Sequence, residues 1–200
     1  MVQKTTTEAP RRGRPRGFDP EQALKAASER FRSRGYSGTS LDDLVDATGL
    51  ARPSLYAAFG DKRAIYLAAL ERATINVDRA FAGLIALDLP IRESLHAIFR
   101  NAIDGYLTGE TRASGCIMVS TSATSAVDDP EVRARLETFL GIEDARVEEL
   151  LVARGDAKAR AHARIVAAVI HSLSVRARAG ASREELDEIA ADCVDLIAGH

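Results

Sequence analysis

The sequence predicts an all-α protein with about nine helices, and three observations support this fold class. Alanine, leucine, arginine and glutamate, which are good helix formers, recur throughout the 200 residues, whereas aromatic residues make up only 5% and tryptophan is absent. Apolar residues return at the spacing of one helix face, and beyond residue 75 no segment alternates like a half-buried strand. Helix start and stop signals separate these segments from one another.

The composition excludes several classes of protein. A chain with 46% hydrophobic and 28% charged residues is typical of a globular protein. It has no stretch of about 18 uncharged apolar residues, so no membrane span is expected, and its N-terminus lacks the apolar core of a secretory signal. Cys116 and Cys193 match no metal-site spacing. We therefore expect free thiols, no metal or cofactor, and a cytoplasmic location.

Charge is distributed unevenly along the chain. Residues 1–63 carry 12 Lys and Arg against 8 Asp and Glu, whereas the remainder carries 15 against 21. The positive N-terminal part favours a polyanion as its partner. Residues 1–17 have no periodic apolar residues and are expected to form a flexible basic arm.

Four helices are expected in the first part of the chain after this arm. Asp19 and Pro20 begin the first, where Gln22 can complete a capping box, and Gly35 ends it. A capping box over Thr39–Asp42 begins the second helix, and Gly49 ends it. The apolar positions of these two helices are Leu24, Ala27, Phe31, Leu41, Leu44, Val45 and Thr48.

The third helix is expected to begin near Arg52 and Pro53 and to end at Gly60, where Asp61 caps a fourth helix. Five more helices follow, and the last begins with a capping box at Ser182. Their expected ranges are 90–106, 116–126, 130–151, 157–179 and 182–197.

The turn between the second and third helices carries the strongest functional signal. Gly49 permits positive φ, and the apolar Leu50 next to it can hold the two helices together, as a helix-turn-helix requires. Arg52 and Ser54 then lie at the start of the second helix of the pair, where side chains reach base edges in the major groove. An ordinary helical hairpin is the alternative, although the helix N-termini at Thr39 and Lys62 favour phosphate binding nearby.

Residues 18–70, in particular GYSGTSLDDLVDATGLARPSLYAAFGDKRAIYLAAL, resemble the DNA-binding domain of the TetR family of transcription regulators. The resemblance implies an N-terminal domain over 18–63 that binds double-stranded operator DNA, and a ligand-binding and dimerisation domain over 64–200. The residues that it implies in DNA binding are Thr39, Ser40, Arg52, Pro53, Ser54, Tyr56 and Lys62. Ala51 departs from the family pattern, because many members have a capping serine there, and the lost cap costs about 1 kcal/mol.

The basic arm contains a Gly-Arg-Pro core that resembles the minor-groove segment of AT-hooks. We expect Arg14 and Arg16 to enter the minor groove beside the operator, where narrow, electronegative DNA favours arginine. The alternative is a basic tail that only increases solubility.

Two apolar helix faces near the C-terminus are expected to form a homodimer interface. A helix-turn-helix contacts only a short stretch of DNA, so proteins of this kind usually bind two half-sites as a dimer. Two helices from each subunit can then form a four-helix bundle. The alternative is that these faces close the core of the monomer. The residues are His162, Ile165, Val166, Val169, Ile170, Leu173, Leu186, Ile189, Cys193, Leu196 and Ile197.

Residues 90–151 are expected to enclose a pocket for a small-molecule effector that the sequence does not identify. Each candidate is otherwise a core residue: His96, Phe99, Tyr106, Cys116, Met118, Ser122 and Phe139. Cys116 follows Gly115 at a helix start, where the helix dipole is expected to lower the thiol pKa. Gly-Cys-Ile-Met also resembles a TetR subgroup in which some members sense oxidants or electrophiles, whereas others keep the cysteine as a structural residue.

The sequence predicts no enzyme, because its four histidines lie apart from any nucleophile, phosphate loop or metal cluster. The resemblance, together with the position of the fourth helix between the two domains, implies a repressor that a ligand releases from its operator by moving that helix and so the two recognition helices. A DNA-binding or architectural protein without ligand gating, or a cysteine-based sensor, remains the alternative.

Overall fold

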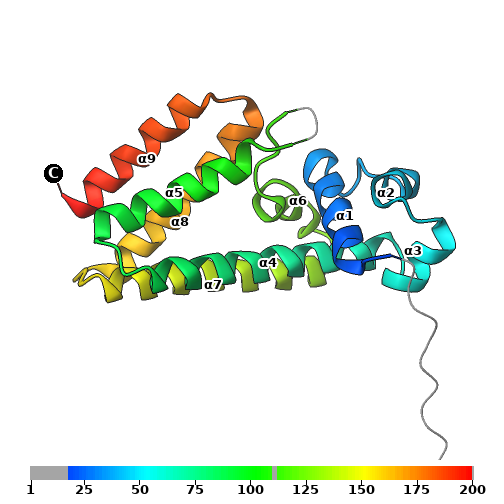
Figure 1. Ribbon diagram of the computed structural model, residues 1–200, viewed down its shortest axis with the longest axis horizontal. Coiled ribbons are helices and arrows are strands. Elements are labelled where there is room, and N and C mark those ends of the chain that lie inside the picture. Colours follow the sequence, from blue (N-terminus) through cyan, green and yellow to red (C-terminus); the bar gives the residue numbers. More distant parts are fainter. Residues whose placement is uncertain (1–17, 110–111, 200) are drawn as a thin grey trace, which may run out of the picture.

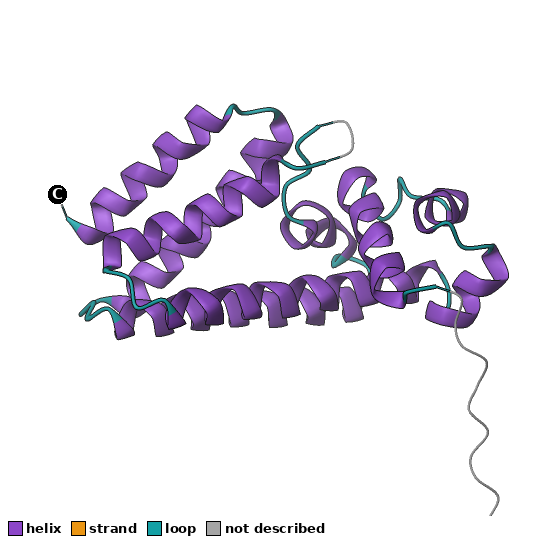
Figure 2. Ribbon diagram, in the orientation of Figure 1, coloured by secondary structure: helices purple, strands orange, loops and turns teal. Residues whose placement is uncertain are grey.

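The computed structural model describes residues 18–109 and 112–199, and this part of the chain is helical with connecting loops (Figures 1 and 2). The predicted all-α fold with about nine helices is confirmed. In these residues the helices are α1 (Pro20–Arg34), α2 (Leu41–Thr48), α3 (Arg52–Phe59), α4 (Lys62–Ala86), α5 (Ile91–Leu107), the π-helix η1 (Met118–Ser122) with α6 (Ala123–Ser125), α7 (Pro130–Ala153), α8 (Ala159–Ala179) and α9 (Arg183–Ala198).

Local capping determines where the first helices begin and end. Asp19 caps α1, because its carboxylate accepts a hydrogen bond from the amide of Glu21 at 2.9 Å. This bond forms instead of the capping box expected with Gln22. The box of α2 is one residue later than predicted: Ser40 Oγ accepts from the Asp43 amide at 3.1 Å, and Asp43 accepts from the Ser40 amide at 2.8 Å.

The short helix α3 begins without a side-chain cap at Ala51, as predicted, and Pro53 lies in its first turn. The carboxylate of Asp61 then accepts the amide of Ala64 at 2.8 Å and caps α4. The predicted capping box of Ser182 and Glu185 at the start of α9 is confirmed.

Helix α4 belongs to two hydrophobic cores. Its first half, including Ile65 and Leu70, packs with α1–α3, η1 and the start of α7. Its second half, including Phe81 and Leu84, packs with α5, α7, α8 and α9. Helices α4 and α7 lie side by side, with α1–α3 at one end and α5, α8 and α9 over the other half (Figure 1). The domain limits at residue 63 stay a prediction, and apolar contacts cross this position.

None of the helices in the two described ranges has both the length and the apolar character needed to cross a membrane.

Candidate functional site

The beginning of α3 presents a row of exposed side chains on a buried anchor. Leu55 is 1% exposed and fastens the helix to the core, whereas Arg52, Pro53 and Ser54 are all exposed. Tyr56, on the following position, is 43% exposed. The three residues predicted to face bases, and the tyrosine predicted to contact phosphate, are therefore accessible to a ligand at the end of the molecule that carries α1–α3 (Figure 1).

The turn before α3 has the geometry that the sequence predicts. Gly49 has φ 67°, in the left-handed region, and its amide donates to Val45 O at 2.9 Å to end α2. A residue with a Cβ is strained in this conformation, which explains the glycine. The turn therefore sets the angle between α2 and α3 and exposes the first turn of α3.

Arg52 is held by an acidic partner on the neighbouring helix. Its Nη2 lies 2.5 Å from Asp42 Oδ1, and both side chains are more than half exposed. Because both groups are open to water, the pair is weak, and a base or phosphate can displace Asp42 at small cost. The pair holds the guanidinium beside the start of α3 in the absence of DNA.

Thr39 is not available for the phosphate contact that the resemblance implies. Its side chain is fully buried, and its Oγ1 donates to Gly35 O at 2.7 Å. This prediction is wrong for the side chain, because the hydroxyl is used to close the turn between α1 and α2. The exposed Ser40 is the residue at the N-terminus of α2, where its hydroxyl also contacts Asp43.

Lys62 begins α4 and lies over an aromatic cluster. Its Nζ is 4.4 Å from the centre of the Tyr36 ring, a distance at which the ring attracts a cation. Tyr36 packs against Tyr66 at 4.8 Å between ring centres, and Tyr66 packs against Phe31 at 5.0 Å. The ammonium group is thus positioned by rings from the core of α1–α4. The predicted minor-groove residues Arg14 and Arg16 lie outside the described residues.

An exposed α3 on a helix-turn-helix, carried by an all-α body, defines a DNA-binding regulator. Residues 23–69 match the family of bacterial regulatory proteins described as the tetR family. The HTH-type transcriptional repressor ComR of Escherichia coli (strain K12) is 31% identical over 92% of this chain and 91% of its own length. The chain therefore belongs to the TetR family of transcription regulators, and its non-enzymatic class is as predicted.

Two further relatives support this assignment. The HTH-type transcriptional repressor BdcR of the same strain is 29% identical over 96% of this chain and 94% of its own length. A solved structure of a cysteine mutant of CifR, a TetR family regulator complexed with 26bp double-strand operator DNA, has a TM-score of 0.78 at 29% identity, covering 91% of this chain and 98% of that one.

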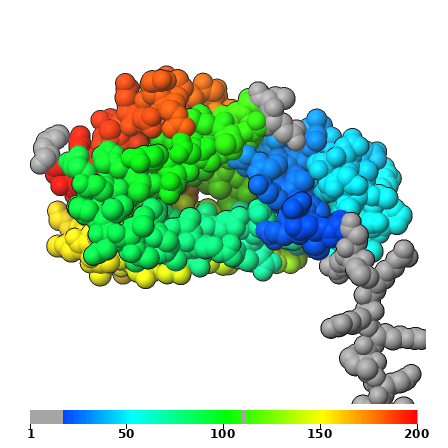
Figure 3. Space-filling model, in the orientation of Figure 1, coloured from blue at the N-terminus to red at the C-terminus, as the bar shows by residue number. Residues whose placement is uncertain are grey.

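A cavity of about 190 Å³ lies between α4, α5, α7 and α8. Figure 3 shows the surface hollowed between α4 and α5. Three of the predicted ligand residues, Tyr106, Cys116 and Phe139, line it. Most of the remaining wall is apolar, and Asn101 and Glu143 add polar groups. The arrangement suits a small ligand with an apolar body and a polar end.

The other four predicted ligand residues lie elsewhere. His96 and Phe99 border a separate surface groove between α5 and α9. Met118 is fully buried in the core shared with α1–α4, and the buried hydroxyl of Ser122 donates to Met118 O within its own helix. The sequence predicts only that residues 90–151 enclose a pocket, and it does not show which of their side chains line it.

Glu143, which lines the cavity, forms an ion pair with His171 that was not predicted from the sequence. Glu143 Oε2 lies 2.5 Å from His171 Nε2, and the two side chains are 4% and 26% exposed. The hydrogen bond to Glu143 raises the pKa of His171 above its ordinary value. One feature of the sequence could have indicated this pair: Glu143 lies in the apolar stripe of α7 that Phe139, Val147 and Leu150 form. Burial also raises the pKa of Tyr106 well above its ordinary value, so its hydroxyl stays a donor.

Cys116 has the opposite acidity to the one predicted. Burial raises the pKa of its thiol, although hydrogen bonds from the amides of Val119 and Met118 act in the other direction. The helix-start effect is present but is outweighed, because the thiolate loses its hydration between α5 and η1. Oxidant sensing through this cysteine stays a prediction.

The predicted dimer residues separate into two groups. Those that are buried among the chain's own helices belong to the monomer core, which corrects the prediction for Val166, Ile170, Leu173, Leu186 and Cys193. Ile165 is 38% and Leu196 71% exposed, and Val169, Ile189 and Ile197 are half-buried. His162 pairs with Asp156 at 2.7 Å. The two helices thus bury one face, and Ile165 and Leu196 are apolar side chains on their outer faces.

Proposed function

We propose that this protein is a transcriptional repressor that binds a palindromic operator as a homodimer and is released from it by a small molecule. The observation that carries the proposal is the exposed start of α3, Arg52–Ser54, on a fold that matches relatives named as repressors. The CifR structure supports operator DNA as the ligand of this end of the molecule. Such a protein acts on the bacterial chromosome, in the cytoplasm.

The homodimer is supported by the outer faces of α8 and α9. Besides Ile165 and Leu196, Val175 is 55% exposed on α8. A second copy of the same two helices would cover these side chains and place two α3 helices on successive half-sites. Leu196→Glu is expected to give a monomeric mass in analytical ultracentrifugation and to lose operator affinity.

The cavity supports a neutral, mostly apolar effector. Among the described residues that line it, Glu143 is the one charged side chain, and no lysine or arginine is present to bind an anion. Tyr106 and Asn101 provide hydrogen-bonding groups at the wall. Phe81 and Leu84 of α4 also form the wall, so an effector in the cavity would contact α4, the helix that begins directly after α3. Moving α4 changes the separation of the two recognition helices.

The first test is selection of the operator from random DNA with the full chain, followed by titration of labelled operator. Arg52→Ala is expected to lower the preference for the operator over random DNA by about 1–3 kcal/mol, the value of one good base contact. The exposed Arg100 of α5 provides the matched control, Arg100→Ala, which leaves this preference unchanged. Equal losses for both variants would contradict base reading by α3.

The second test is displacement of the labelled operator by two panels of small molecules, one neutral and apolar, the other anionic. The neutral panel is expected to contain compounds that release the DNA. Operator binding that no compound relieves would favour a regulator without ligand gating, and release by anions alone would contradict the assignment of the effector class.

A further inference from the structure

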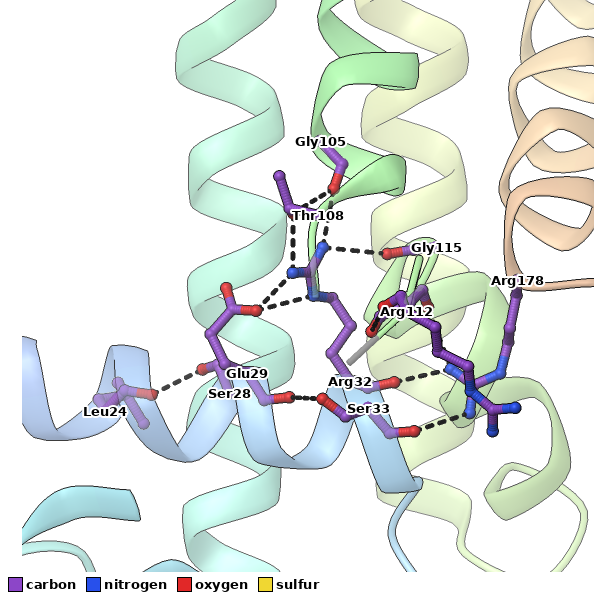
Figure 4. Close-up of polar contacts among 11 residues, drawn as sticks. Leu24, Ser28, Glu29, Arg32, Ser33, Gly105, Thr108, Arg112, Gly115 and Arg178 are labelled. Carbon is purple, nitrogen blue, oxygen red and sulfur yellow. Dashed lines mark hydrogen bonds and ion pairs between the residues drawn. The ribbon is translucent and has the colours of Figure 1, made fainter. Parts of the chain in front are cut away.

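Two arginines from different helices lie where α1 meets the wall of the cavity (Figure 4). Arg32 is in the last turn of α1, and its side chain is 13% exposed. Arg178 is in the last turn of α8. We call these two residues, with the backbone carbonyls that they bind, the arginine clasp.

Arg32 binds the end of α5 and the segment that leads into η1. Its Nη1 donates to Gly105 O at 2.9 Å and to Gly115 O at 3.4 Å, and its Nη2 donates to Thr108 Oγ1 at 3.0 Å. Glu29, one turn earlier on α1, accepts from Nε at 3.0 Å and holds the guanidinium in place. A residue of the DNA-binding end of the molecule thus caps a helix of the other core.

Arg178 makes the reciprocal contact. Its Nη1 donates to Arg32 O at 2.7 Å, and its Nη2 donates to Ser33 O at 3.3 Å, so it caps the C-terminal end of α1 (Figure 4). The same Nη1 donates to Ser114 O at 3.0 Å. The consecutive carbonyls of Ser114 and Gly115 are therefore bound one by each arginine.

On the side of the clasp that faces away from α1, each group that the arginines bind either lines the cavity or is hydrogen-bonded to a residue that does. Gly105, Tyr106 and Cys116 all line the cavity. The amides of Ser114 and Gly115 donate to Tyr106 O at 3.2 and 3.1 Å. A ligand that displaces Gly105, Tyr106 or Cys116 therefore moves a residue that is itself hydrogen-bonded to Arg32 or Arg178, or is next to or hydrogen-bonded to one that is.

The segment from Ser114 to Cys116 has little room to absorb such a push. Gly115 has φ 66°, and a Cβ on it would lie 2.7 Å from Ser174 O of α8. The amide of Cys116 donates to Ser174 Oγ at 2.8 Å. Closely packed elements pass on a displacement instead of deforming continuously, so the push reaches the guanidinium groups of Arg32 and Arg178.

We infer that the arginine clasp transmits occupation of the cavity to the helix-turn-helix through α1. Phe31, next to Arg32, is fully buried against Tyr66, so a shift at the end of α1 moves the core on which α2 and α3 rest. Arg32 and Arg178 are positioning residues, which touch neither the operator nor the effector. This inference rests on the proposed function. It assigns a second route, through α1, by which the effector acts on the helix-turn-helix, in addition to the route through α4.

The experiment fills the cavity with a side chain and asks whether the operator end responds. Ala102 of α5 lines the cavity, and Ala102→Phe acts as a permanent occupant that requires no identified effector. Ala102→Leu is the smaller substitute if the phenylalanine variant does not fold. Each is combined with Arg32→Met, which keeps the length of the stem and removes the donors. Affinity for the selected operator and thermal unfolding are measured for every variant.

In the otherwise unchanged chain, Ala102→Phe is expected to lower operator affinity by about tenfold, a typical allosteric coupling. In the Arg32→Met background the same substitution is expected to cost less than about threefold, and Arg32→Lys restores part of the coupling. The matched control is Arg72→Met, which removes an ion pair with Glu21 of 2.8 Å at the other end of α1 and is expected to leave the tenfold effect intact.

An equal loss in the Arg32→Met and unchanged backgrounds would overturn the clasp as the route and leave ligand gating standing. Loss of the coupling in Arg72→Met as well would also overturn it, because any loosening of α1 would then suffice. If Ala102→Phe and Ala102→Leu fold and leave operator affinity unchanged in the original background, ligand gating itself fails, and the clasp fails with it.

Discussion

Glu143→Gln is predicted to destabilise the protein in a pH-dependent manner through His171. The substitution keeps the shape of the side chain and removes its charge, while a neutral hydrogen bond to the imidazole remains possible. Because Glu143 raises the pKa of His171 above the ordinary value of 6.5, the folded state binds a proton that the unfolded state releases first. The stability from this pair is therefore complete below pH 6.5 and is lost as the pH rises through the raised value.

The magnitude follows from the burial of the two groups. Glu143 is 4% and His171 26% exposed, with 2.5 Å between their atoms, so the pair is shielded from water and its charged hydrogen bond is worth about 1.5–3 kcal/mol. The free energy of unfolding is expected to fall by that amount at about pH 5.5, and by less at about pH 9, because the stability from the pair declines as the pH rises through the raised pKa of His171.

Urea unfolding followed by circular dichroism measures this difference, with the protein concentration held constant because dimerisation contributes to stability. Glu137→Gln is the matched control, since Glu137 is an exposed glutamate of the same helix and its replacement is expected to change little at either pH. A loss for Glu143→Gln that is equal at both pH values, or larger at the higher one, would refute the reasoning.

Three further predictions concern single groups. Thr39→Val removes the buried hydrogen bond to Gly35 O and is expected to lower the free energy of unfolding by about 1 kcal/mol with unchanged operator affinity; weaker DNA binding at unchanged stability would restore a phosphate role for Thr39. Gly115→Ala places a Cβ 2.7 Å from Ser174 O at positive φ and is expected to cost about 2 kcal/mol or more in urea unfolding. A neutral effect would contradict the close packing of Gly115 against α8. Cys116, whose pKa burial raises, is expected to react with iodoacetamide near pH 7 more slowly than free cysteine by mass spectrometry, and rapid alkylation would support a sensor role instead.

The sequence by itself determined the helical class, most helix ends and the family. These are set by local chemistry: Asp19, Gly49 and the Ser182 box act on the backbone within a few residues of themselves. The motif from Gly35 to Lys62 is equally local, because a helix-turn-helix is one continuous segment. The box predicted at Thr39 was wrong by one residue, since both Thr39 and Ser40 are capable of capping and only the packing of the turn selects between them.

Only the tertiary structure decided which helix each apolar face meets. A stripe such as Ile165, Ile170 and Leu173 shows that part of α8 is buried. It does not show that Ile170 and Leu173 belong to the monomer core, that Ile170 also lines the cavity, or that Ile165 is exposed. The cavity wall runs from Val77 to Ile170, and the clasp joins residues 146 positions apart. The periodicity of apolar residues predicts which face of a helix is buried, but not which residues that face contacts. The hydrogen-bonding partners of Glu143, Arg32 and Arg178 are determined by the packing of helices that are distant in the sequence.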